Sequence, residues 1–91
     1  MARVKLPTIL RSHAGGERAV DAEGRTLREL LEDLETRYPG ITQMVLTADG
    51  ALHRFVNVYV NDEDVRYLGS LETEVDPEDT VSILPAVAGG R

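Results

Sequence analysis

Apolar and polar residues alternate with a period of two along several short stretches, which is typical of β-strands with one buried face. We expect strands at residues 3–8, 17–22, 54–60, 63–68 and 80–84. Pro7 should lie near the end of the first strand, since proline has no amide hydrogen to donate. Turn residues between 11 and 17 join the first two strands as a hairpin, and Asn61-Asp62 predicts a second hairpin.

One stretch instead has the period of an amphipathic helix. Its apolar positions are Leu27, Leu30, Leu31, Leu34 and Tyr38. Thr26 followed by Glu29 forms a capping-box pattern at its start, and Pro39-Gly40 ends it. We expect a helix of about 13 residues and about 20 Å. Its solvated face carries two i,i+4 pairs of opposite charge, Arg28 with Glu32 and Asp33 with Arg37.

The order of these elements predicts an α+β domain in which one main helix lies across one sheet. Residues 41–53 are ambiguous, and they fit a short helical turn followed by a loop at Asp49-Gly50. We expect the folded domain to occupy residues 1–85 and a separate tail to occupy residues 86–91.

Composition narrows the class of protein. The chain has 91 residues, of which 42% are hydrophobic, so it fits one soluble domain, and no apolar run approaches the roughly 20 residues of a membrane-spanning helix. The net charge of -6 and the scattered basic residues argue against a nucleic-acid partner and favour a partner with a basic docking face. Without cysteine, the chain has no disulfide and no thiolate nucleophile. No signal peptide is recognisable, so we expect a cytoplasmic protein.

No residue pattern predicts an active site. His13 and His53 are the only imidazoles, and neither has a recognisable metal or acid-base partner at a characteristic spacing. The acidic run 62–64 lacks the spacing of a calcium loop, and Gly15-Gly16 is not followed by the Lys-Ser/Thr of a phosphate loop. Both stretches are better explained as turns. We therefore expect neither catalytic nor metal-binding residues in this chain.

Two aromatic residues are candidates for docking a partner. Phe55 and Tyr59 alternate with Val56, Val58 and Val60 and should lie on the opposite face of the strand. If the helix covers the valines, the aromatic side chains remain on an open sheet face, where exposed aromatics are typical of interaction sites. The alternative is that the loop at 41–53 covers them.

The C-terminal residues are a second candidate. They read Ala86, Val87, Ala88, Gly89, Gly90 and Arg91. The stretch 86–90 could extend about 17 Å beyond the last strand. Its small side chains would let the peptide thread a narrow cleft and bring a terminal carboxylate to a reactive centre, since glycine has no Cβ to clash. The alternative is a frayed terminus, with which most chains end.

Three stretches of the chain carry a family likeness. They are PTILR at 7–11, LHRFVNVYVNDEDVR at 52–66 and ILPAVAGG at 83–90. In this order they resemble the MoaD/ThiS sulfur carriers, and they are most similar to the CysO-type carriers of actinobacterial cysteine biosynthesis. The likeness covers essentially the whole chain. It implies a ubiquitin-like β-grasp fold, with a mixed sheet of four or five strands packed on one main helix.

The resemblance also implies a function for the tail. In this family an E1-like activating enzyme uses ATP to adenylate the terminal glycine, here Gly90, and sulfur then converts the acyl-adenylate to a thiocarboxylate. In CysO-type systems the thiocarboxylate attacks an acceptor that a PLP-dependent cysteine synthase forms from O-phosphoserine, and a zinc JAMM-type metalloprotease releases cysteine. ATP, PLP and zinc belong to these partners. The chain itself is therefore expected to bind no cofactor and to be a carrier, not an enzyme.

Arg91 departs from the family pattern, because it leaves the terminal carboxylate on arginine and not on Gly90. Either a protease removes it first, with the JAMM-type enzyme as the natural candidate, or the arginine is a cloning remnant; we favour processing. Three other functions stay open. Sulfur could go to a thiosugar, thiamin, molybdopterin or another natural product; the chain could be a ubiquitin-like modifier of lysines; or it could be a β-grasp binding module with an inert tail.

Overall fold

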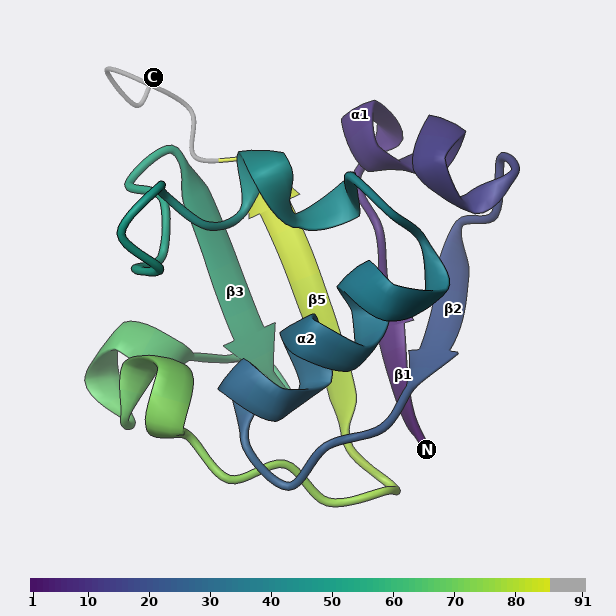
Figure 1. The fold of residues 1–91 in the computed structure, drawn as a ribbon. Coiled ribbons are helices and arrows are strands. Elements are labelled where there is room, and N and C mark those ends of the chain that lie inside the picture. The colour runs from purple at the N-terminus through teal and green to yellow at the C-terminus, as the bar shows by residue number, and fades with distance from the viewer. Residues whose placement is uncertain (86–91) are drawn as a thin grey trace.

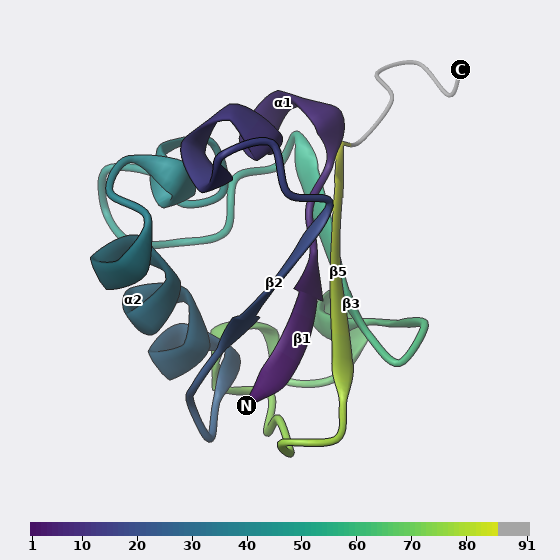
Figure 2. The ribbon, with the colours of Figure 1, turned by 90° about the vertical axis from the view of Figure 1, so that its right-hand side faces the viewer.

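The computed structural model describes residues 1–85, and the tail at 86–91 lies outside the described residues. A five-stranded sheet is covered on one face by a single long helix, α2 (Figure 1; Figure 2). The strands are β1 (Ala2–Lys5), β2 (Ala19–Ala22), β3 (Val56–Val60), β4 (Glu63–Asp64) and β5 (Thr80–Pro85), and α2 spans Leu27–Arg37. The strand order across the sheet is β2-β1-β5-β3-β4.

The sheet is mixed because the first and last strands, β1 and β5, are neighbours in it and run parallel, whereas the other neighbours are antiparallel. β1 pairs with β2 and β3 pairs with β4 as antiparallel neighbours, whereas β1 and β5 run parallel. β5 is also antiparallel to β3, so it has a hydrogen-bonded neighbour on each edge. The α+β class and the mixed sheet with one main helix are therefore confirmed.

The core lies between α2 and the covered face of the sheet. All four leucines predicted for the buried face of the helix are fully buried: Leu27, Leu30, Leu31 and Leu34. They join inward-facing residues of the strands, among them Val4, Val58, Val81 and Ile83. The period of two in the strands and of 3.6 in the helix thus reflects one shared apolar layer.

The predicted capping box at the start of α2 forms, but the Glu29 side chain bonds a different backbone amide from the one expected. The Thr26 hydroxyl accepts from the Glu29 amide at 3.2 Å, but the Glu29 carboxylate accepts from the amide of Arg25, one residue before the cap. Of the two predicted ion pairs, Asp33 with Arg37 forms at 2.7 Å. Arg28 instead pairs with Glu72, at 2.8 Å.

Glu35 fixes the chain where α2 ends. Its carboxylate accepts from the Gly40 amide at 2.6 Å and from the amide and hydroxyl of Thr42 at 3.1 and 2.6 Å. These bonds, with that from Gly40 the strongest, hold the pKa of Glu35 below its ordinary value. The following residues form the helical turn η2 (Ile41–Met44), and an isolated bridge between Leu46 and Leu52 closes the loop that was ambiguous in the sequence.

The predicted first strand is wrong beyond Lys5. Residues Thr8–Arg11 form the short helix α1, followed by a 3-10 turn at Ser12–Ala14. Pro7 explains the change, because it cannot donate to the ladder and its φ of -71° suits the start of a helix. The helix places Leu10 in the core, at the end of the sheet.

The strand predicted at 63–68 is also mostly wrong. Only Glu63–Asp64 pairs with β3, through a two-residue turn in which Asn61 and Asp62 both have positive φ. The chain then forms 3-10 turns at Val65–Tyr67 and Ser70–Glu72. The cause is local, since the Asp64 carboxylate accepts from the Arg66 amide and starts the first of these turns.

Candidate functional site

The predicted tail follows directly from the central strand of the sheet. The residues assigned to it, Ala86 to Arg91, lie outside the described residues, so their roles stay predictions. Its starting point is described: Pro85, the last residue of β5, pairs with Val56 of β3. Because β5 pairs with β1 at its start and with β3 as far as Pro85, the sheet fixes the position of the residue from which the tail begins (Figure 2).

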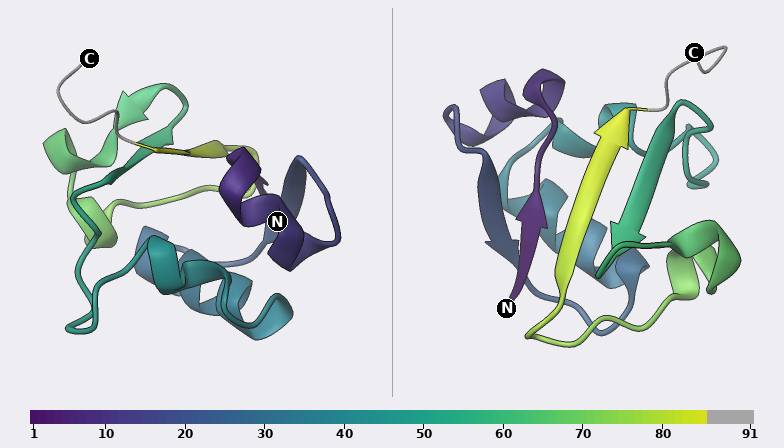
Figure 3. Two further views of the ribbon diagram at one scale, coloured as in Figure 1. Left: turned by 90° about the horizontal axis from the view of Figure 1, so that it is seen from above. Right: turned by 180° about the vertical axis from the view of Figure 1, so that it is seen from behind.

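The face of the sheet opposite α2 is open and lies beside the start of the tail (Figure 3, right). Strand register arranges its side chains in rows. One row runs Ala19, Lys5, Ser82, Tyr59 and Asp64 across all five strands. The next row toward the tail pairs Leu84 with Asn57. Leu84 is 47% exposed, which makes it an apolar group on this face one residue before the last described residue.

The two aromatic candidates lie differently from each other. Tyr59 is on β3 and half-buried, whereas Phe55 precedes the strand and is 51% exposed. The Phe55 ring lies 5.1 Å from the His53 ring and 5.2 Å from the guanidinium carbon of Arg54. The 41–53 loop therefore covers Phe55 only in part, through His53, and leaves about half of the residue exposed. Docking through either residue stays a prediction.

Arg66 holds the segment that carries Phe55 next to the end of β5. Its guanidinium donates to the carbonyls of His53 and Val56 at 3.1 and 2.7 Å and to the Asn57 side chain at 2.8 Å. Val56 is the residue that pairs with Pro85. Arg66 thus connects the 3-10 turn after β4 to the strand end beside the tail.

Sequence reasoning missed both Leu84 and Arg66. The signal for Leu84 was present, because Val81 and Ile83 were expected to point inward and strand alternation then turns Leu84 to the open face. Arg66 had no such signal. Its partners are nine to thirteen residues earlier in the chain and meet it only because β3 and the turn after β4 lie side by side.

The sequence predicted no metal site, no phosphate loop and no membrane-spanning helix, and the described residues can be searched for each. No group of three His, Cys, Asp or Glu side chains able to hold a metal occurs among residues 1–85. His53 accepts a hydrogen bond from the Phe55 amide. Gly15 and Gly16 have positive φ and form an ordinary turn, as expected. Within the same range no helix is long and apolar enough to cross a membrane.

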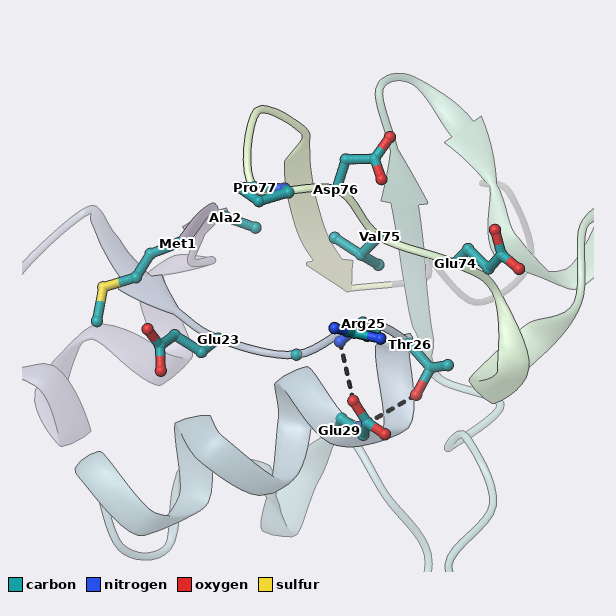
Figure 4. Close-up of a pocket in the computed structure, with 11 residues that line it drawn as sticks. Met1, Ala2, Glu23, Arg25, Thr26, Glu29, Glu74, Val75, Asp76 and Pro77 are labelled. Carbon is teal, nitrogen blue, oxygen red and sulfur yellow. Dashed lines mark hydrogen bonds between the residues drawn. The ribbon is translucent and has the colours of Figure 1, made fainter.

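A cleft of about 900 Å³ lies near the start of β5, at the other end of that strand from Pro85 (Figure 4). The starts of β1 and α2 and the residues before β5 line it, with Glu23, Glu29, Glu74 and Asp76 around the rim. The Glu29 carboxylate already accepts from the Arg25 amide, and the Glu29 amide donates to the Thr26 hydroxyl (Figure 4). Since β5 starts here and ends at Pro85, this cleft is one strand length from the tail and is not part of the candidate site.

Comparison with known proteins identifies the family. The model of the ThiS family matches residues 4–90. The sulfur carrier protein CysO of Mycobacterium tuberculosis is 54% identical over 89 residues, which is 96% of each chain.

Solved structures agree with this assignment. A crystal structure of the Amycolatopsis orientalis BexX/CysO complex contains a chain with a TM-score of 0.91 and 54% identity, covering 99% of this chain and 100% of that one. The small archaeal modifier protein 1 of Methanosarcina acetivorans has a TM-score of 0.80 at 28% identity, covering 98% and 95%. The β-grasp fold and the family resemblance are therefore confirmed, and the chain is a small carrier rather than an enzyme. It belongs to the ThiS family of ubiquitin-like sulfur-carrier proteins.

Proposed function

We propose that this sulfur carrier bears its sulfur as a thiocarboxylate on Gly90 after removal of Arg91, and that it supplies the sulfur for cysteine biosynthesis. The observation that carries the proposal is the near-full-length likeness to CysO proteins, in a chain whose Gly89-Gly90 pair follows the central strand of the sheet.

The chemistry accounts for the residues at the end of the chain. A carboxylate is a poor electrophile, so its oxygen first attacks the α-phosphate of ATP, releasing pyrophosphate and giving an acyl-adenylate. A sulfide equivalent then attacks the acyl carbon and AMP leaves, which gives the thiocarboxylate. Its sulfur is a strong nucleophile, and the carrier needs no thiol of its own, in keeping with the absence of cysteine. While Arg91 is present, the Gly90 carbonyl is part of a peptide bond, so Gly90 can follow this route only after Arg91 has been removed.

The geometry supports delivery of the tail into a partner active site. Pairing of Pro85 with Val56 gives the tail a fixed origin, so a partner that docks on the open face also receives the tail at a defined point. Residues Ala86, Val87, Ala88 and Gly89 have side chains small enough for a narrow channel. Phe55, Tyr59 and Leu84 supply the apolar part of the docking face.

The partners follow from this chemistry. The carrier requires an E1-like adenylating enzyme that holds ATP, a PLP-dependent cysteine synthase that presents an acceptor derived from O-phosphoserine, and a zinc JAMM-type metalloprotease. The protease would remove Arg91 and later release cysteine by hydrolysis at Gly90. The A. orientalis CysO was crystallised in a complex, which supports the general expectation that such carriers bind a protein partner.

A second function is conjugation to target proteins, as in a ubiquitin-like modifier. The similarity of fold to a small archaeal modifier protein supports this second function. Both routes begin with the same adenylate and differ in whether sulfur or a lysine amine attacks it.

Intact-mass measurement of the protein from its native host tests the proposal. The expected species lacks Arg91 and carries one sulfur in place of one oxygen. Adducts in which residues 1–90 are joined through Gly90 to lysines of other proteins, without the sulfur species, would support the modifier instead. A chain that always ends in Arg91 would refute both functions.

A further inference from the structure

A second surface feature lies beside the start of the tail. A groove of about 470 Å³, which we call the basic groove, is lined by residues at the start of β2 and toward the ends of β1 and β5. Its lining contains three cationic residues, Lys5, Arg11 and Arg18, and an apolar part that includes Leu84. Because Leu84 is the residue before Pro85, the groove is continuous with the point where the tail leaves the domain.

The charge of this groove is opposite to that of the whole chain. The net charge is -6, yet no carboxylate among residues 1–85 lines the groove. The acidic side chains concentrate elsewhere, on α2 and at 72–79. Nine of the sixteen acidic residues lie in these two stretches: Glu29, Glu32, Asp33, Glu35, Glu72, Glu74, Asp76, Glu78 and Asp79. Net charge therefore gives a poor description of the surface next to the tail.

None of the three cations forms an ion pair within residues 1–85, and two of them, Lys5 and Arg18, are also free of the inward turn of Arg11. Arg3, one row away, forms an ion pair with Asp21 at 3.9 Å, whereas no ion pair within the described chain involves Lys5 or Arg18. Both are exposed. Their backbone positions are fixed, since Lys5 pairs with Ala19 and Ser82 and the Arg18 carbonyl accepts from the Leu6 amide at 2.8 Å. The third cation, Arg11, is turned inward and donates to the Leu6 carbonyl.

We propose that the basic groove binds an acidic segment of the adenylating enzyme, with Asp or Glu side chains placed against Lys5 and Arg18. The inference rests on the proposed function, because it names the chemistry of the partner that receives the tail. Charge complementarity favours an acidic peptide, and an exposed arginine can hold a carboxylate through two parallel hydrogen bonds. The apolar part around Leu84 adds contact area that a small free anion would not use. An extended acidic segment therefore fits the groove better than an isolated phosphate.

The test compares charge reversals at two exposed arginines. Arg18→Glu changes the groove, and Arg25→Glu makes the same change of charge beside the cleft at the other end of the sheet. Affinity for the purified adenylating enzyme of the same organism is measured by calorimetry at about 0.1 and about 1 M salt, where the screening length falls from about 10 to about 3 Å. Adenylation of each variant is measured in parallel, and thermal unfolding confirms that each variant is folded.

Arg18→Glu is expected to weaken binding about fivefold at low salt, with most of the difference lost at high salt, while Arg25→Glu has little effect. The conservative variant Arg18→Lys should keep most of the affinity. Equal weakening by both reversals, or no weakening by Arg18→Glu in a chain that is still adenylated, overturns the groove proposal and leaves the proposed function intact. Failure of the otherwise unchanged chain from which Arg91 has been removed to be adenylated overturns both the groove proposal and the proposed function.

Discussion

Replacement of Leu84 by alanine separates docking from folding. Leu84 lies on the open face, paired across the strands with Asn57, and its side chain is not part of the buried core. Truncation should therefore change the stability of the free domain little, by about 0.5 kcal/mol, as for other exposed positions. It removes an apolar group that a partner receiving the tail would cover.

The expected loss of affinity follows from the exposed fraction. Complete burial of a leucine side chain is worth about 1.5–3 kcal/mol. Leu84 is 47% exposed in the free chain, so a partner that covers the rest gains about half of this, roughly 0.7–1.4 kcal/mol. Since 1.4 kcal/mol corresponds to tenfold in Kd, Leu84→Ala should weaken binding of the adenylating enzyme by about threefold to tenfold.

Calorimetric titration of the enzyme with wild type and variant measures this change. Met44→Ala is a matched control, because Met44 is exposed to a similar extent, 48%, but lies in η2, which packs with α2 on the covered side of the sheet. Equal affinities for Leu84→Ala and wild type, or an equal loss in both variants, would show that the open face is not the docking surface. A large loss of stability in Leu84→Ala would refute the assignment of Leu84 to the surface.

Three further predictions follow from the described contacts. Gly24→Ala should lower the free energy of unfolding in urea by about 2–3 kcal/mol, because a Cβ there would lie 2.7 Å from the Leu30 Cα; Gly16→Ala, with no atom within 4 Å, should cost less. Glu35→Gln should cost about 1 kcal/mol at neutral pH. Since folding lowers the Glu35 pKa, its stabilisation is present above the ordinary value of 4.5 and is lost as pH falls through the lowered value, so unfolding curves of the variant should show a smaller loss of stability in acid. Phe55→Ala should weaken enzyme binding without changing thermal stability, because half of the ring is already exposed; a fall in thermal stability with unchanged binding would assign Phe55 a structural role instead.

Local patterns predicted the elements that are both regular and buried. The helix at 27–37 and the strands around 19–22, 56–60 and 80–85 follow from their periodicity, and the capping pattern at Thr26 located the start of the helix within one residue. The two wrong strands have a shared cause. Pro7 has no amide hydrogen to donate to the strand ladder, and the Asp64 carboxylate binds the Arg66 amide and starts a 3-10 turn. In both places the apolar residues that follow are buried by a helical turn and not by a strand.

The sequence also predicted the family and the importance of Gly89-Gly90, because a short linear motif needs no tertiary contacts to be recognised. It could not predict what surrounds the start of the tail. β1 and β5 become parallel neighbours although more than seventy residues separate them, and only this pairing brings Lys5 and Arg18 to Leu84.

The sequence by itself thus determined the fold class and the covered face of the sheet. These depend on side-chain period and on residue type, which are local properties. Tertiary structure decided which residues share the open face: it placed a basic groove beside the end of β5 in an acidic protein, and it placed Arg66 against β3. Strand order and register decide such neighbours, and both are set by the whole core and not by any single segment.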